Sequence, residues 1–148
     1  MTRTSKFLCV FYALVAIAAL YGTQSENLQY SSTFWQFLTQ SPIRFITDLR
    51  ANPASRSISI DIFWFFLAAA ALMVREARRI GVRFVWAFIV LGFFIAISVT
   101  FPLFLIARET RMASPAPAGP PSRLTTTLDV IGLALLTAIV AGYAVWLH

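Results

Sequence analysis

Four long runs of apolar residues alternate with shorter polar segments along the chain. They cover about residues 7–22, 58–74, 84–107 and 128–147. At a rise of about 1.5 Å per residue, each run reaches about 24 Å or more, comparable with a hydrocarbon core of about 30 Å. Backbone polar groups in lipid must bond within the chain, so the runs predict four transmembrane helices in an all-α bundle.

The polar segment between the first two runs predicts a short helical cap over about residues 31–50. Ser31 or Ser32 is a suitable N-cap. Apolar side chains recur at helical spacing in two sets, which are Phe34, Phe37 and Leu38, and then Ile43, Ile46 and Leu49. Amphipathic segments of this kind lie along a membrane interface. We expect a packing cap over the mouth of the bundle, with a substrate lid as the alternative.

The segment "SPAPAGPPSR", residues 114–123, interrupts the helical pattern. Its four prolines and one glycine forbid a continuous helix. We therefore predict a three-helix core with its cap over residues 1–111, a proline-rich linker over 112–127, and a fourth helix over 128–148.

Small residues follow one face of the predicted fourth helix. Ala134, Ala138 and Gly142 recur every four residues, which leaves a groove where another backbone can approach closely. The first expectation is that this groove packs against the chain's own bundle. The alternative is contact with a membrane protein partner or with a second copy in a homodimer.

The composition agrees with a multi-pass membrane protein. Hydrophobic residues make up 59% of the chain and charged residues only 12%, about half the charged share of soluble domains. The excess of 12 basic over 6 acidic residues indicates lipid headgroups, and not nucleic acid, because the basic residues flank the apolar runs.

The basic residues also predict an orientation. The link "REARRIGVR", residues 75–83, and the amino terminus with Arg3 and Lys6 are dense in positive charge, which favours the cytoplasmic side. The links predicted to lie outside contain as many basic residues, but these are spread over a longer segment. The orientation is therefore predicted from the density of basic residues and not from their number. Four crossings then place both termini in the cytoplasm, with the protein in the cell (inner) membrane. We expect the first run to be retained, with signal cleavage after Ala18 as the alternative.

Several kinds of chemistry are disfavoured by the residues present. The one histidine is the final residue, His148, so no pair of axial haem ligands is expected between helices. The one cysteine, Cys9, lies inside the first apolar run and resembles a buried hydrophobic residue. We therefore predict no catalytic residue, no metal site and no cofactor.

Two carboxylates mark the ends of the second run. Asp61 stands near its head and Glu76 near its tail, about 22 Å apart along a helix, so they cannot form one acid/base pair. Asp61 is interpreted first as favourable charge at a helix amino terminus beside a capping serine. The alternatives are an ion pair with Arg108 at the predicted outer surface, where Glu109 also lies, and a catalytic carboxylate.

The arginine-rich link is a second candidate site. Glu76 and Arg79 are spaced to pair on one helical face. The whole link predicts a solvated helix end, with lipid-headgroup or partner contact as its functional interpretation. The residues concerned are Arg75, Glu76, Arg78, Arg79 and Arg83. In the third run, Pro102 predicts a kink, and Trp86 is expected to anchor the interface.

Three motifs resemble a known family. "ANPASRSISIDIFW", "REARRIGVRFVW" and "FPLFLIARE" follow in the order and spacing of the small membrane proteins of domain of unknown function 2834. The matching positions are Asn52, Pro53, Asp61, Glu76, Arg78, Arg79, Gly81, Trp86, Pro102, Leu103, Phe104, Arg108 and Glu109. The resemblance covers about residues 5–111, so the linker and fourth helix extend beyond it. It implies a compact helical bundle and no particular reaction.

We therefore expect a non-enzymatic accessory or scaffold subunit of a membrane. Its contact surfaces would be the arginine-rich link and the small-residue groove. One alternative is an enzyme or carrier that handles a lipid or isoprenoid, with Asp61 facing an outer cavity. A weaker alternative is a small-solute transporter assembled from several copies.

Overall fold

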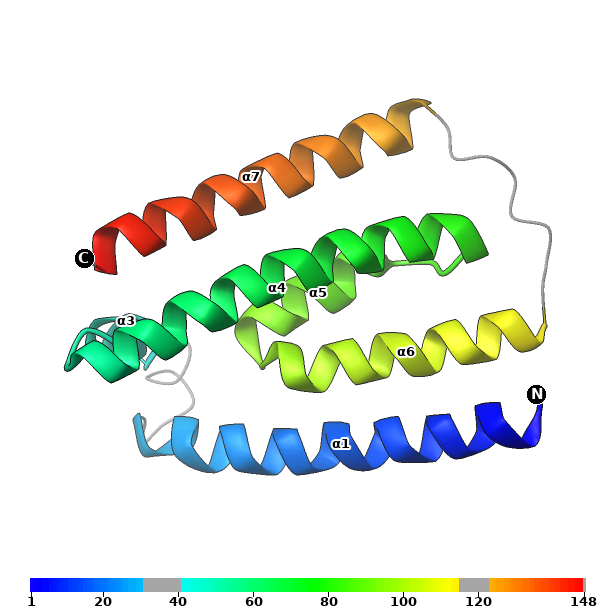
Figure 1. Cartoon of the computed structure of the whole chain (residues 1–148), viewed down its shortest axis with the longest axis horizontal. Coiled ribbons are helices and arrows are strands. Elements are labelled where there is room, and N and C mark those ends of the chain that lie inside the picture. The colour runs from blue at the N-terminus through cyan, green and yellow to red at the C-terminus, as the bar shows by residue number, and fades with distance from the viewer. Residues whose placement is uncertain (31–40, 115–122, 148) are drawn as a thin grey trace.

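The computed structural model describes residues 1–30, 41–114 and 123–147, and these residues form helices and no strand. The elements are α1 (Arg3–Asn27), the 3-10 helix η1 (Leu28–Tyr30), α3 (Ser41–Asp48), α4 (Pro53–Ile80), α5 (Val85–Phe94), α6 (Ile97–Ala113) and α7 (Arg123–Leu147). In Figure 1 the longer helices lie roughly along one axis. The predicted all-α class is confirmed.

Three helices are long and apolar enough to cross a membrane. These are α1, α4 and α7. They correspond to the first, second and fourth apolar runs. Helix α4 begins before its apolar run because Asn52 accepts a hydrogen bond from the Ser55 amide at 2.9 Å and Pro53 occupies the first turn.

The third apolar run does not form the single transmembrane helix predicted for it. It is divided into α5, of 10 residues, and α6, of 17 residues, with a break at Ile95 and Ala96. Three helices within the described residues qualify as candidate spans and the third run forms a helical hairpin, so the predicted number of four transmembrane helices is not confirmed.

Contacts along α5 and α6 show that the two helices run antiparallel. Phe88 and Phe104 stack edge to face with ring centroids 5.9 Å apart. At the end of the pair away from the turn, Arg111 Nε donates to the carbonyl oxygen of Gly81 at 3.1 Å. The chain therefore leaves α4, runs along α5 and turns at Ile95 and Ala96. It then returns along α6 to the end of the bundle where α4 finishes. Figure 1 shows that this α5–α6 hairpin stops short of the far end of the bundle.

Side-chain packing explains why the turn falls where it does. A Cβ at Gly92 would lie 2.6 Å from Thr100 Oγ1, so the small residue allows the two arms to approach closely. Gln24 Nε2 on α1 donates to the carbonyl oxygen of Ile95 at 3.2 Å and bonds a carbonyl at the break. The interruption lies upstream of Pro102, which is accommodated inside α6, and not at the predicted kink.

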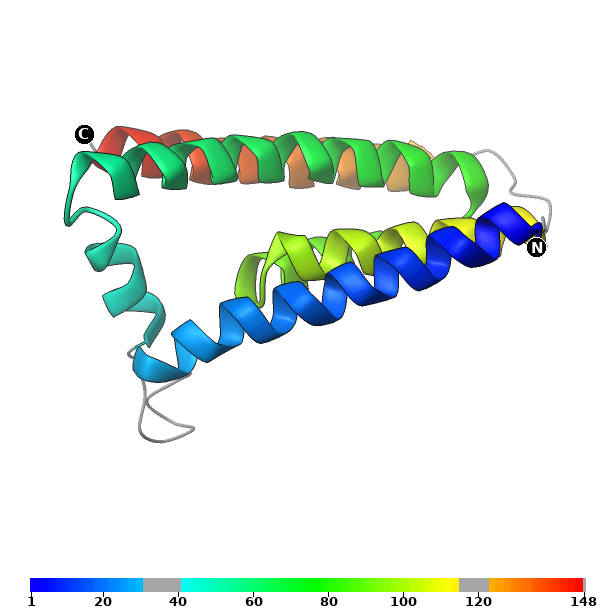
Figure 2. The same ribbon diagram turned by 60° about the horizontal axis from the view of Figure 1, so that its bottom comes forward.

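The bundle has two layers, visible edge-on in Figure 2, with α4 beside α7 and α1 beside α6. Helices α4 and α7 are antiparallel: Phe63 meets Tyr143 at a centroid distance of 4.5 Å near one end, and Arg78 meets Asp129 near the other. The core lies where α4 faces the hairpin, and its buried residues are Phe66, Ala70, Met73, Val74, Ala77, Val82, Val85, Ile89 and Phe104.

The two termini lie at opposite ends of the bundle (Figure 1). Met1 lines a hollow with Met112 and Ala113, beside the open end of the hairpin. At the far end, the Arg50 guanidinium lies 4.6 Å from the ring centroid of Trp146. The chain ends lie apart because the α5–α6 hairpin turns back before the far end, and the prediction that both termini share one side of a membrane stays a prediction.

The second half of the predicted cap contains a helix, and its role as a cap stays a prediction. Helix α3 (Ser41–Asp48) lies at the far end of the bundle, with Ile46 and Leu49 partly buried and Arg44 exposed. Its first half, residues 31–40, lies outside the described residues, as does half of the predicted linker, residues 115–122. Helix α7 begins at Arg123, earlier than the predicted start at residue 128.

Candidate functional site

A network of ion pairs joins three helices at the end of the bundle that contains the amino terminus, which we call the basic end. Glu76 on α4 lies at its centre. It accepts two hydrogen bonds from Arg79, at 2.7 and 2.6 Å, which confirms the predicted pairing on one helical face. Glu76 also accepts a hydrogen bond from Arg108 Nε on α6 at 2.7 Å. The pair thereby connects the second arm of the hairpin to α4.

Two further contacts hold the end of α6. Arg108 Nη1 donates to Glu109 Oε1 at 2.9 Å, and Glu109 is buried, with only 6% of its surface exposed. Arg111 bonds the carbonyl oxygen of Gly81, the residue that ends α4 in a left-handed conformation with φ of 77°. Glycine adopts this conformation at no steric cost, which makes it the usual residue at a helix carboxyl end.

Asp129 attaches α7 to the rest of the bundle. It accepts hydrogen bonds from Arg78 Nε at 2.7 Å and Arg78 Nη2 at 2.8 Å, and from Trp86 Nε1 at 2.9 Å. Only 6% of Asp129 is exposed, so these three donors replace the water that its carboxylate has lost. We call Arg78, Trp86 and Asp129 the Asp129 clamp. Next to it, Gly132 allows the Trp86 ring to lie against α7.

The structure separates Asp61 from the residues predicted to meet it. Arg108 binds Glu76 and Glu109 at the basic end, so the predicted Asp61–Arg108 pair is wrong. The amino-terminal charge interpretation is also wrong, because α4 begins at Pro53 and its first turn contains no acidic residue. Asp61 is exposed, whereas Ser59 is buried on the packed face of α4. Helical positions two apart point in nearly opposite directions, so Asp61 faces away from the core.

The predicted groove of small residues lies on the outward face of α7. Ala134, Ala138 and Gly142 are all exposed, and a Cβ placed on Gly142 would meet no atom within 4 Å. The first expectation, packing against the chain's own bundle, is therefore wrong. Helix α7 packs on α4 through its opposite face, where Val140 and Leu147 are buried.

The arginine-rich link is divided into paired and outward-facing residues. Glu76, Arg78 and Arg79 take part in the ion pairs described above. Arg75 and Arg83 are exposed, and the contacts described for the chain give neither of them a carboxylate partner. The sequence interpretation treated all of these residues as one surface, whereas the structure uses part of the link to hold the bundle together.

Sequence reasoning missed the roles of Asp129 and Trp86. Asp129 is not among the candidate site residues predicted from the sequence, and Trp86 is predicted only as an interfacial anchor. The available signal was a carboxylate within the first turns of an apolar helix, because such a group persists near lipid when a cation pairs with it. The carboxylates at this end accept hydrogen bonds from arginines, and the described residues contain no group of His, Cys, Asp and Glu suited to a metal ion. This arrangement stabilises the bundle.

These features define a small all-helical protein of membrane type, with its helices tied together by ion pairs at one end. The chain belongs to the family described as "Protein of unknown function DUF2834", whose model matches residues 11–110. The matched segment runs from α1 to the end of α6, so α7 lies outside it. Neither the curated proteins nor the solved structures contain a match to this chain.

Proposed function

We propose that the protein is a non-enzymatic accessory or scaffold subunit, and that α7 is the helix on which its membrane partner docks. The observation that carries this proposal is the outward direction of Ala134, Ala138 and Gly142. Transmembrane helices associate through small residues because these let two backbones approach closely. The partner is a transmembrane helix, from another membrane protein or from a second copy of this chain.

The attachment of α7 supports the same proposal. One face of the helix is fixed by the Asp129 clamp near its start and by the contact of Tyr143 with Phe63 near its end. A helix held at both ends presents its other face at a defined angle. Because α7 also lies beyond the family match, it adds a docking surface to the family's helical core.

The α5–α6 hairpin changes the number of basic residues at each end of the bundle, and this number predicts the orientation in the membrane. With the hairpin returning to its starting end, nine of the 12 basic residues belong to the basic end and three to the far end. The nine are Arg3, Lys6, Arg75, Arg78, Arg79, Arg83, Arg108, Arg111 and Arg123. This asymmetry supports a cytoplasmic basic end in the cell membrane, with the carboxyl terminus on the opposite side.

The enzyme or carrier alternative loses its main support. It required Asp61 to face a cavity between helices, whereas Asp61 is exposed on the side of α4 opposite to Ser59 and the packed face. The accessory role is therefore preferred.

The test is purification of the full chain in mild detergent after cross-linking in the membrane. We expect a stoichiometric partner, or a second copy, that is lost with Ala138→Leu. The matched control is Ala18→Leu, the same change at an exposed alanine of α1, and it should leave the association intact. A protein that always purifies alone, or equal losses with both variants, would contradict the proposal.

A further inference from the structure

The net positive charge of the protein is concentrated at the basic end. The far end contains Arg44, Arg50 and Arg56 against Glu26, Asp48 and Asp61, so its formal charge is zero. The basic end has nine basic residues against Glu76, Glu109 and Asp129, so it carries the whole formal charge of +6. A bilayer whose leaflets differ in charge would therefore distinguish the two ends of the molecule.

The ion pairs determine which residues provide this charge. The three carboxylates of the basic end are all bound to Arg78, Arg79 or Arg108. Those three guanidinium groups are neutralised within the bundle. The remaining charge belongs to Arg3, Lys6, Arg75, Arg83, Arg111 and Arg123. Of these, Arg75 lies in the last turns of α4, Arg83 lies in the link between α4 and α5, and both are exposed.

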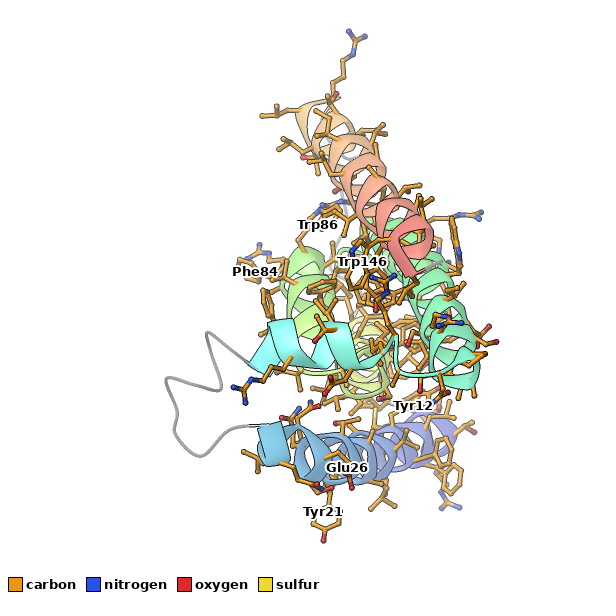
Figure 3. All side chains as sticks on the ribbon, turned by 90° about the vertical axis from the view of Figure 1, so that its left-hand side faces the viewer. Tyr12, Tyr21, Glu26, Phe84, Trp86 and Trp146 are labelled. Carbon is orange, nitrogen blue, oxygen red and sulfur yellow. The ribbon has the colours of Figure 1, made fainter. Side chains whose placement is uncertain are left out.

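The link itself presents an aromatic residue beside Arg83. Val82 and Val85 are buried and fix the link to the core, whereas Phe84 between them is 80% exposed. Phe84 has a φ of 58°, in the left-handed region that residues other than glycine seldom adopt. Figure 3 shows its side chain at the periphery of the bundle. A strained backbone thus presents a large apolar ring next to an arginine at the boundary of the apolar helices.

We propose that the exposed residues Arg75, Arg83 and Phe84 bind the phosphate headgroups of anionic phospholipids around the basic end. Guanidinium groups bind phosphate oxygens through paired hydrogen bonds. An aromatic ring at the same level inserts among the upper parts of the acyl chains. The inference does not depend on the docking role of α7, because that surface lies on another helix.

Lipid selectivity of the full-length protein tests the inference. The detergent-solubilised protein is mixed with equal amounts of phosphatidylglycerol and phosphatidylcholine with identical chains, and bound lipids are counted by native mass spectrometry. We expect the wild type to retain phosphatidylglycerol preferentially. The double variant Arg75→Gln/Arg83→Gln should reduce the preference about 25-fold, because each basic residue near a charged headgroup contributes roughly a factor of five and two are removed.

Two controls separate this site from a general effect of charge. Arg44→Gln/Arg56→Gln removes the same charge at the far end and should leave the preference unchanged. Arg75→Lys/Arg83→Lys should retain most of it, which excludes misfolding as the cause of a loss. Phe84→Ala should weaken retention of both lipids. Equal binding of the two lipids by wild type, equal losses in both glutamine variants, or an acidic protein in place of lipid would overturn the inference. The Ala138→Leu variant should keep its lipid preference, so a failure of the docking proposal is distinguishable.

Discussion

The Asp129 clamp makes a quantitative prediction about the attachment of α7. Replacing Asp129 with Ala removes the acceptor for three hydrogen bonds, two from Arg78 and one from Trp86. The guanidinium and the indole N–H would then be left without their acceptor in a partly buried position. Breaking such a site costs about 2–3 kcal/mol, since leaving a donor unsatisfied costs about 1–3 kcal/mol.

The coupling between Arg78 and Asp129 is smaller than the cost of either single change. Hydrogen bonds between membrane helices couple by about 0.6 kcal/mol on average and about 1.7 kcal/mol at most. A charged partner roughly doubles the energy of such a hydrogen bond. Solvent weakens the interaction, because 30% of the Arg78 side chain is exposed. We therefore expect a coupling of about 1.5 kcal/mol.

A double-mutant cycle measures this coupling. Wild type, Arg78→Gln, Asp129→Ala and the double variant would be unfolded with SDS in mixed dodecylmaltoside micelles, with tryptophan fluorescence as the signal. Trp86 contacts the carboxylate directly and reports on the clamp. Asp61→Asn is the control, because this exposed carboxylate should contribute less than about 0.5 kcal/mol. Additive single costs, within about 0.5 kcal/mol, would refute the reasoning.

Three further predictions concern packing, the hairpin and topology. Gly132→Ala should destabilise the fold by about 1–3 kcal/mol in the same SDS titration, because its Cβ would lie 2.4 Å from the Trp86 ring. Gly142→Ala, which meets nothing within 4 Å, should be neutral or gain up to about 1 kcal/mol of helix propensity. Gln24→Leu should cost about 1–3 kcal/mol, because the Ile95 carbonyl oxygen loses its donor. Topology reporters fused to the two termini should give opposite results, and matching results would exclude three crossings.

The long helices could be predicted from the sequence because length and apolarity suffice to identify them. Helices α1, α4 and α7 follow the apolar runs, and the amphipathic pattern around Ile46 and Leu49 indicated α3. Their boundaries depended on local capping that the apolar pattern does not contain. Asn52 and Pro53 start α4 well before its apolar residues begin.

The hairpin could not be predicted in the same way, because neither Ile95 nor Ala96 breaks a helix by its own propensity. The turn is specified by residues distant in sequence or hidden in the packing. Gly92 allows contact with Thr100, and Gln24 supplies a hydrogen bond from another helix. The hydropathy of the sequence shows only that the third run is apolar, and it does not locate the turn.

The prediction of the candidate site was wrong where it depended on the topology of the chain. Once the third run was taken as a full crossing, Arg108 and Glu109 were assigned to the wrong end of the bundle. Glu76 and Arg79 were paired correctly because their contact lies within one helix and needs no knowledge of the fold. Contacts between helices, such as Arg78 with Asp129, cannot be predicted correctly when the number of membrane crossings is wrong.

The hairpin also determines what a helix appended after α6 does to the position of the carboxyl terminus. The family segment begins near the amino-terminal end of α1 and finishes near the end of α6, and both positions lie at the basic end. A chain that stopped there would keep its two ends in one compartment. On the proposed three-crossing topology, appending a single helix such as α7 places the new carboxyl terminus in the other compartment. Tail extensions with odd and even numbers of crossing helices would then place that terminus in opposite compartments.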